Sequence, residues 1–251
     1  MLLIKTIAAA FSMFTIVPMP QFDFDERNNK YMLALFPLVG AVQGLLLWGV
    51  YWLGIHFGLH YIIRSVLLFM TPIIYTGGIH LDGFMDTFDA LSSRQEKEKR
   101  LKIMSDPHIG AFAVIALAVY CLVGFGLWCS IEDFDPELFI LMSMLSRSLA
   151  GYAMLTFPAA KDSGLASFFA RAGSKSASGA ISALITIFLG IAFFMKGVRG
   201  ICILASALVM LLIYGRTAKS KFGGITGDLS GWFLSLSELL MLTVYVMTAG
   251  M

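Results

Sequence analysis

The chain has 251 residues, a formal net charge of +2 and 58% apolar residues, but only 14% charged residues. Soluble domains carry about 25% charged residues, so this chain has too few charges to cover a surface that faces water. The composition excludes a disordered chain and argues against a soluble enzyme, and the mean hydropathy of +0.82 favours an integral membrane protein. The small net charge gives no indication of a nucleic-acid partner.

The amino-terminal segment 2–17 is a short apolar run with one lysine, Lys5, and it ends at Val17-Pro18-Met19-Pro20. A cleavable signal peptide would have a longer apolar run before its small residues. We therefore expect a retained segment that lies in the membrane interface or re-enters it.

Apolar runs long enough to cross a bilayer as helices recur along the rest of the chain. The expected spans are 31–54, 61–79, 109–131, 138–157, 177–195, 199–215 and 231–250. The longest polar stretch, 80–108, is too short to bury a core of its own. We expect a single all-α membrane domain over 1–251, polytopic, with about seven transmembrane helices plus the interfacial segment.

Small residues at helical spacing mark two expected packing faces. Gly40 precedes Gly44 by four positions, and Gly54 precedes Gly58 by the same interval. Because such pairs let helix backbones approach closely, we expect all four glycines to lie at helix contacts.

Lysines and arginines gather in the loops of one side of the membrane. Only Lys196 and Arg199 lie in loops of the other side, and Arg64 and Arg147 lie inside spans. The other fourteen are Lys5, Arg27, Lys30, Arg94, Lys97, Lys99, Arg100, Lys102, Lys161, Arg171, Lys175, Arg216, Lys219 and Lys221. Because cytoplasmic loops carry the excess of basic residues, the catalytic face is expected on the cytoplasmic side of the cell inner membrane, in contact with lipid.

The densest polar motif contains Asp82, Asp86 and Asp89, spaced i, i+4, i+7. On a helix these three carboxylates share one face, where they would repel each other at the membrane boundary. A divalent cation removes that conflict, and hard oxygen ligands select Mg²⁺, Mn²⁺ or Ca²⁺. Mg²⁺ also binds substrate phosphates, which points to a pyrophosphate substrate. The simpler alternative, a solvated acidic helix start, explains Asp82 but not the other two.

Further candidates for chemistry flank this motif or lie within spans. His80 and His108 are acid–base candidates, and Asp106 is a candidate for a further metal ligand or a base, although Asp106 is equally well explained as a helix N-cap before Pro107. Arg147 is too costly to face lipid, so we expect it to face an inner cavity and pair with a carboxylate or a substrate phosphate. Glu238, also within a span, is hard to explain by structure alone.

A glycine-rich segment, Gly223-Gly224-Ile225-Thr226-Gly227-Asp228, opens the last expected span. Glycine-rich backbone before a helix N-terminus suits phosphate binding, and close packing explains the glycines nearly as well. The lysine-containing P-loop signature is absent. We assign Gly223, Gly224, Gly227 and Asp228 as candidates for phosphate binding.

These motifs together resemble one enzyme family. The strings GGIHLDGFMDTFDAL, IMSDPHIGAF and GGITGDLSG, with Glu238 downstream, resemble cobalamin synthase, also called adenosylcobinamide-GDP ribazoletransferase. The resemblance extends over most of the chain. The family pattern has glycine at Ala90, Ser-Arg at Pro107-His108, threonine at Leu229 and commonly Arg-Glu at Lys161-Asp162. The arginine missing at His108 means that a phosphate clamp is not carried over to that position.

The resemblance implies a Mg²⁺-dependent transfer in a late step of cobalamin biosynthesis. The adenosylcobinamide phosphate group passes from adenosylcobinamide-GDP to α-ribazole or its 5′-phosphate, which yields adenosylcobalamin or its 5′-phosphate and GMP. On this reaction the three motif aspartates are expected to bind Mg²⁺, and Asp106 or His80 is the candidate base. Asp228 and the 223–227 backbone are expected at the guanosine phosphates or a second metal, with Arg147 and Lys161 as phosphate contacts.

Two alternatives of other kinds stay open at the level of sequence. A membrane CDP-alcohol-type phosphotransferase also uses helical aspartates, but its signature resembles D-x-x-DG-x-x-AR, whereas Gly83 follows Asp82 directly here. A cation-coupled transporter would carry its acids near mid-membrane on several helices, often in paired halves. The sequence leaves the lower-ligand base and the oligomeric state open.

The charge asymmetry predicts the orientation of the 80–108 stretch. In a variant without the native cysteines, Gln95→Cys should resist an impermeant thiol reagent in intact cells and react after permeabilisation. Glu132→Cys, in an acidic loop of the other side, is the control and should react in intact cells. Ready labelling of Gln95→Cys from outside would overturn the orientation.

Overall fold

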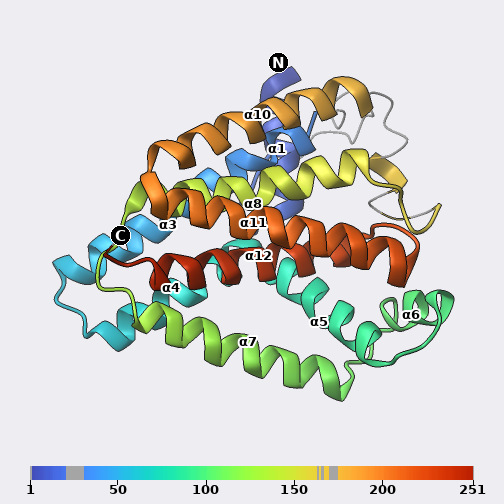
Figure 1. The fold of residues 1–251 in the computed structure, drawn as a ribbon, viewed down its shortest axis with the longest axis horizontal. Helices are drawn as coiled ribbons and strands as arrows, with labels where there is room; N and C mark the ends of the chain where they lie inside the picture. Colours follow the sequence, from blue (N-terminus) through green and yellow to red (C-terminus); the bar gives the residue numbers. More distant parts are fainter. Residues whose placement is uncertain (1, 21–30, 163, 165–166, 170–174, 251) are drawn as a thin grey trace.

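The structure is a computed structural model that describes residues 2–20, 31–162, 164, 167–169 and 175–250, and its regular elements in these ranges are helices (Figure 1). In chain order they are α1 (Leu2–Phe14), η1 (Leu33–Leu35), α3 (Phe36–His56), α4 (Tyr61–Thr76), α5 (Ile79–Ser92), α6 (Lys97–Ile103), α7 (Ala111–Cys129), α8 (Pro136–Thr156), α10 (Lys175–Met195), α11 (Gly197–Thr217), η2 (Ala218–Phe222) and α12 (Gly227–Met247). A lone β-bridge joins Ala159 to Ile225.

The expected all-α polytopic architecture is confirmed. Within the described ranges, six helices are long and apolar enough to cross a membrane, and α4 with α5 makes a seventh if the bent pair counts as one span. The six are Leu33–His56, Ala111–Cys129, Pro136–Thr156, Ala177–Met195, Gly197–Phe222 and Gly227–Met247. They differ from the expected spans mainly by a few residues at each end.

The second expected span, 61–79, is broken. Helix α4 ends at Thr76, and α5 leaves it at an angle of 90°. Gly77 and Gly78 both adopt the left-handed conformation, with φ of 64° and 79°. Glycine populates this region at little cost, so the pair allows the sharp turn. The break places the aspartate motif on its own short helix.

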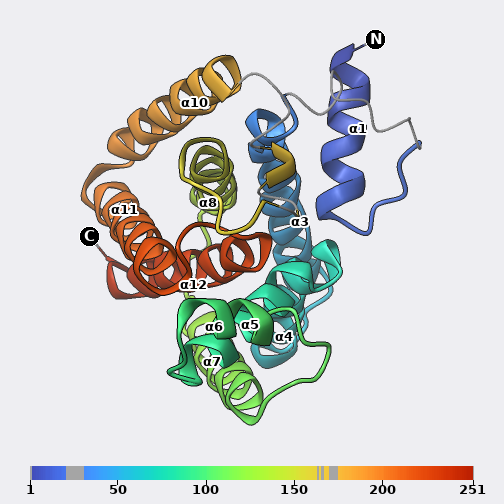
Figure 2. The same cartoon turned by 90° about the vertical axis from the view of Figure 1, so that its right-hand side faces the viewer.

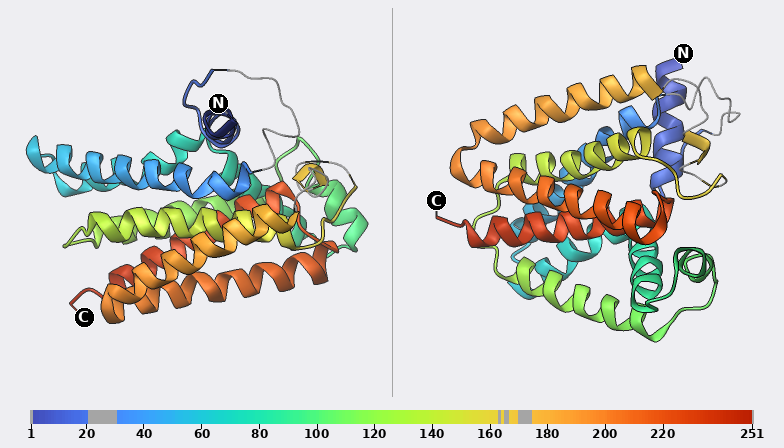
Figure 3. Two further views of the ribbon diagram at one scale, coloured as in Figure 1. Left: turned by 90° about the horizontal axis from the view of Figure 1, so that it is seen from above. Right: turned by 45° about the vertical axis from the view of Figure 1, so that its right-hand side comes forward.

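The amino-terminal helix α1 runs across the direction of the spanning helices, as Figures 1 and 2 show and as the end-on view of α1 in Figure 3 repeats. This orientation agrees with the interfacial segment expected at 2–17. Phe11 and Phe14 are buried against the bundle, whereas Leu3 and Ile4 are more than half exposed. The helix therefore has two apolar faces, one packed on the protein and the other turned outward.

Helix α8 forms the centre of the bundle, enclosed by α3, α10, α11 and α12 in the end-on view of Figure 2. Its Leu145, Leu149 and Ala153 are almost fully buried. Helices at the periphery expose large apolar side chains instead, as with Leu122 of α7 and Phe188 of α10. This inversion is the pattern of a protein whose surround is lipid.

Glycines set the distance between α3 and α8. A Cβ on Gly40 would overlap the Ser143 carbonyl, and one on Gly44 would overlap the Ile140 backbone. The packing role expected for this pair is confirmed. The expectation for Gly58 is wrong: it lies in a left-handed turn after α3, with φ of 61° and open space around it.

Several loops that carry the basic residues meet at one end of the bundle. Arg100 donates a hydrogen bond to the Lys221 carbonyl at 3.3 Å, and Lys161 donates one to the Leu101 carbonyl at 3.2 Å. Arg27, Lys30 and Arg171 lie outside the described residues. The loops are thus brought together, and the assignment of that end to the cytoplasm stays a prediction.

The α3–α8 contact generates a stability prediction. Gly40→Ala should lower the melting temperature in detergent because its methyl group has no space, at a cost of about 1–3 kcal/mol. Gly49→Ala, on the same helix with nothing within 4 Å of the added Cβ, is the matched control and should be neutral or slightly stabilising. Equal effects of the two substitutions would contradict the close-packing argument.

Candidate functional site

The candidate site lies where α5 crosses α12. A Cβ on Gly83 of α5 would lie 2.7 Å from the Asp228 carbonyl oxygen, and one on Gly231 of α12 would lie 2.9 Å from the His80 carbonyl oxygen. Ser235 also donates a hydrogen bond to that His80 oxygen at 3.2 Å. Two glycines therefore let the helix backbones touch, and this contact places Asp228 beside the start of the aspartate motif.

Four carboxylates gather at this crossing, three from α5 and one from α12. Asp82, Asp89 and Asp228 all lie within electrostatic range of Asp86. The Asp89 carboxylate lies against Gly110, where any Cβ would overlap it. The shared helix face expected for the first three aspartates thus receives a fourth acid from α12 and is closed on one side by the start of α7.

The donor set suits Mg²⁺ in chemistry. It consists of hard carboxylate oxygens, with Asp82 exposed and Asp86, Asp89 and Asp228 half-buried. Within the described part of the chain, no group of three or more His, Cys, Asp or Glu side chains is placed to hold a metal ion by itself. Mg²⁺ usually keeps several waters and binds through one or two carboxylates plus substrate phosphates, so a shared site fits better than a protein cage. Mg²⁺ binding here stays a prediction.

Lys161 brings a positive charge to the same place. Its loop is fixed by the β-bridge, in which the Ile225 amide donates to the Pro158 carbonyl at 2.8 Å. The Lys161 ammonium donates to Ser105 Oγ at 2.8 Å and lies within electrostatic range of Asp228. Lys161 is thus an exposed cation near Asp228, and its role as a phosphate contact stays a prediction.

The glycines before α12 have structural roles. Gly223 is left-handed, with φ of 82°, and ends η2. A Cβ on Gly224 would lie 2.5 Å from the Ala159 backbone. Helix α12 then begins at Gly227, and Thr226 caps it by accepting a hydrogen bond from the Leu229 amide at 3.1 Å. Close packing thus explains Gly224, the left-handed backbone explains Gly223, and a phosphate role for this segment stays a prediction.

Asp106 belongs to a local turn. Its Oδ1 accepts hydrogen bonds from the His108 amide at 3.0 Å and lies 2.6 Å from His108 Nδ1. The amide bond first, and then the side-chain contact, hold the pKa of Asp106 below its usual value. The N-cap alternative is wrong, because Gly110 is the N-cap of α7. A carboxylate with a lowered pKa is a weaker proton acceptor.

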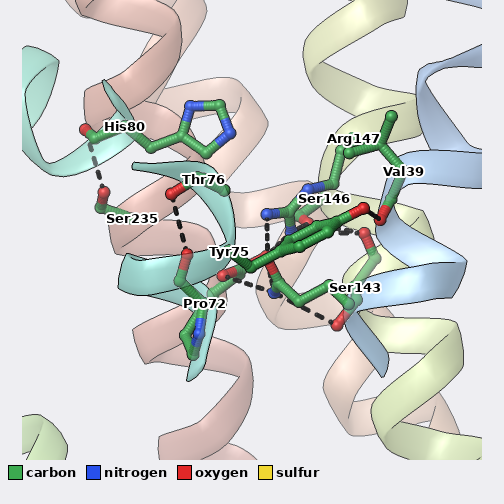
Figure 4. Close-up of polar contacts among 11 residues, drawn as sticks. Val39, Pro72, Tyr75, Thr76, His80, Ser143, Ser146, Arg147 and Ser235 are labelled. Atoms are coloured by element: carbon green, nitrogen blue, oxygen red, sulfur yellow. Dashed lines mark hydrogen bonds and ion pairs between the residues drawn. The ribbon is translucent and has the colours of Figure 1, made fainter. Parts of the chain in front are cut away.

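Arg147 is buried at the junction of α3, α8 and α12, with 1% of its surface exposed. It forms an ion pair with Glu238, and its Nη2 donates to Gln43 Oε1 at 2.6 Å. Ser146 Oγ accepts a third bond at 3.0 Å (Figure 4). The expected pairing with a carboxylate is confirmed. The positive charge of Arg147 is thus neutralised by Glu238 inside the protein. The predicted contact with a substrate phosphate stays a prediction. Gln43, a lone amide in an apolar span, is the partner that sequence reasoning missed.

His80 stands between the buried network and the carboxylates. It lines a small cavity of about 20 Å³ together with Arg147 and Glu238, large enough for about one water molecule. It also lines a larger cavity with Asp82 and Asp228. Its Nε2 is buried and has no hydrogen-bond partner among the described residues. His80 therefore has a buried ring nitrogen that is available to bind a ligand.

Comparisons with known proteins agree on one family. The family model described as cobalamin-5-phosphate synthase matches residues 6–246. An adenosylcobinamide-GDP ribazoletransferase of Lachnoclostridium phytofermentans is 37% identical over 96% of this chain and 93% of its own length. Proteins of the same name from Clostridium botulinum strain Alaska E43 (34% identical; 94% and 95% covered) and Treponema denticola (35%; 95% and 96%) are also similar. No solved structure matches the chain.

The buried ion pair generates a prediction about stability. Glu238→Gln should lower the melting temperature strongly, because it leaves the Arg147 charge buried and uncompensated at a cost of about 3–5 kcal/mol. The double variant Arg147→Met/Glu238→Leu should recover most of that loss.

The control for this prediction is an exposed pair at the other end of the bundle. Lys196 pairs with Glu137, whose side chain is 74% exposed. Glu137→Gln should change stability by less than about 1 kcal/mol. A Glu238→Gln protein as stable as the control, or a double variant worse than the single one, would show that the buried charge needs no partner.

Proposed function

Because the chain belongs to the cobalamin-5-phosphate synthase family, we propose that it is an adenosylcobinamide-GDP ribazoletransferase and that the crossing of α5 and α12 is its active site. The hydroxyl of α-ribazole, or of its 5′-phosphate, attacks the phosphorus on the cobinamide side of the pyrophosphate. A new O–P bond forms, the P–O bond to GMP breaks, and the hydroxyl proton passes to a base. The products are adenosylcobalamin, or its 5′-phosphate, and GMP.

The observation that carries the proposal is the gathering of four carboxylates and one lysine at a close helix contact. Asp82, Asp86 and Asp89 are the proposed holders of Mg²⁺, directly or through water. Bound there, Mg²⁺ would neutralise pyrophosphate charge, which is the main requirement of phosphoryl transfer. Without a cation, four acids would repel the substrate.

The remaining residues have roles in binding and proton transfer. Lys161 and the first amides of α12 after Gly227 are proposed to bind phosphate oxygens, since a helix N-terminus favours anions. His80 is the proposed base on geometry, because its buried Nε2 has no partner among the described residues and its side chain lines a cavity with Asp82 and Asp228, whereas Asp106 is hydrogen-bonded to His108. Arg147 is already paired with Glu238, so we propose that it holds the helices of the site in position and does not bind the substrate directly.

The alternatives lose support on the same evidence. A CDP-alcohol-type phosphotransferase would need a signature that the aspartate motif lacks, and a cation-coupled transporter would distribute its acids near mid-membrane. Here the carboxylates sit at one end of the bundle, beside the basic loops. We further propose that this end faces the cytoplasm of the inner membrane, where water-soluble nucleotides are available.

The proposal predicts the effect of neutralising single aspartates. Asp82→Asn, Asp86→Asn and Asp89→Asn should each lower GMP release by about 10²-fold or more, because each removes charge that would face the pyrophosphate through Mg²⁺. Melting temperatures should barely fall, since less carboxylate repulsion offsets lost contacts. Raised Mg²⁺ should partly rescue the mildest variant.

Glu132→Gln is the matched control, since it neutralises an exposed acid in the loop between α7 and α8, away from the α5–α12 crossing. It should leave both turnover and its Mg²⁺ dependence unchanged. Destabilised Asp82→Asn and Asp86→Asn proteins with normal specific activity would contradict the metal-site proposal.

A further inference from the structure

A cavity of about 180 Å³ lies directly beside two of the site carboxylates, Asp82 and Asp228. Side chains of five segments, α1, η1 with α3, α5, α8 and α12, line it. Most of its wall is apolar: Phe14, Leu33, Phe36, Ile79, Ala150, Met154 and Leu234. The cavity thus joins a charged end to an apolar interior, and nothing in the transfer chemistry itself uses the apolar part.

Besides the Asp82 and Asp228 carboxylates at its charged end, the cavity has two polar side chains, Ser230 and His80. Ser230 Oγ is already engaged by the Tyr214 hydroxyl at 2.9 Å and the Thr226 carbonyl at 3.1 Å. His80 Nε2, by contrast, is buried and has no partner within the described ranges. A buried nitrogen without a partner is unfavourable, so a ligand hydroxyl that donates a hydrogen bond to it would be favoured, which agrees with the proposed role of His80 as base.

The size and lining suit a flat aromatic group. A core cavity of about 150 Å³ lined by apolar side chains accepts a benzene ring. The rings of Phe14 and Phe36 lie 4.2 Å apart, and Phe36 also meets the His80 ring edge-on at 6.2 Å. A corrin macrocycle needs a site of several hundred Å³, in the range of pockets for large ligands. The corrinoid therefore has to remain outside this cavity.

The two aromatic bases in the reaction differ in polarity. Guanine presents several acceptors and donors around its edge, and the apolar part of the lining, including Leu33, Ala150 and Met154, offers none in return. Burying those groups without partners is costly. The base of ribazole is a benzimidazole, which has one free ring nitrogen once it carries ribose. With that single nitrogen, the benzimidazole has far fewer polar groups to satisfy than guanine, so it suits the apolar wall better.

We propose that this cavity binds the base of the acceptor nucleoside, with its ribose turned toward Asp82 and Asp228. The inference rests on the proposed function and deepens it by separating the acceptor site from the donor site. Ala150 and Met154 of α8 then set the depth of the base site and hence the choice of base. Phe14 makes α1 part of the acceptor site.

To test the proposal, a larger side chain fills the cavity, and the KM of each substrate is measured separately in nanodiscs. Ala150→Leu should raise the KM for α-ribazole at least about tenfold, equivalent to about 1.4 kcal/mol, and leave the KM for adenosylcobinamide-GDP within about twofold. Equilibrium dialysis should give the same loss for α-ribazole alone, with guanosine binding unchanged. Unequal shifts of the two KM values are not expected from a merely less stable protein.

A second variant distinguishes a loss of binding from a loss of folding. Met154→Ala enlarges the cavity and should also weaken α-ribazole binding, while it accepts a benzimidazole nucleoside with a bulkier ring. Met241→Ala, on α12 and equally buried but absent from the cavity wall, is the matched control. Both should lose stability, as buried methionines do, and only Met154→Ala should change the acceptor KM.

The outcomes separate this inference from the proposed function. If the unaltered protein releases GMP but Ala150→Leu changes the KM for the donor or for neither substrate, the base site is wrong and the function stands. If the unaltered protein binds neither substrate and releases no GMP, the proposed function fails. Equal dialysis constants for α-ribazole in the unaltered, Ala150→Leu and Met154→Ala proteins would overturn the base site without any turnover measurement.

Discussion

The site depends on one close contact, between the backbones of α5 and α12 at Gly83 and Gly231. With side chains at these positions the helices would separate, and Asp228 would move away from the aspartates of α5. The contact has an electrostatic cost, because four carboxylates then share one small volume. Helix packing has to offset this repulsion, and the cation and pyrophosphate that we propose to bind here would relieve it.

A second constraint comes from the membrane. Charges within spans are costly, and here Arg147 is matched by Glu238 and Gln43 from two other helices. The network joins α3, α8 and α12, and it shares a small cavity with His80. It therefore holds together helices that lie next to the candidate site. The peripheral helices present apolar side chains outward, while the Arg147 charge is paired inside the bundle.

The break between α4 and α5 sets the direction of the helix that carries the aspartates. A straight helix through 61–92 would carry the aspartates along the direction of the other spans. The left-handed pair Gly77-Gly78 instead turns α5 by 90°, so that its acidic face meets α12 and the start of α7. Ile79 and His80, directly after the turn, also line the apolar cavity, together with Phe14 of α1. One two-glycine turn thus shapes both the charged and the apolar parts of the site.

The sequence alone was sufficient for the membrane class, the positions of nearly all spans and the shared face of Asp82, Asp86 and Asp89, because these follow from local composition and helical period. Its motifs also identified the family. Only the tertiary structure decided that Asp228 joins the aspartates, that Arg147 pairs with Glu238 and Gln43, that Gly58 serves a turn, and that an apolar cavity lies beside the carboxylates. These are contacts between residues far apart in the chain, and they depend on which helix faces meet, which periodicity in one segment does not contain.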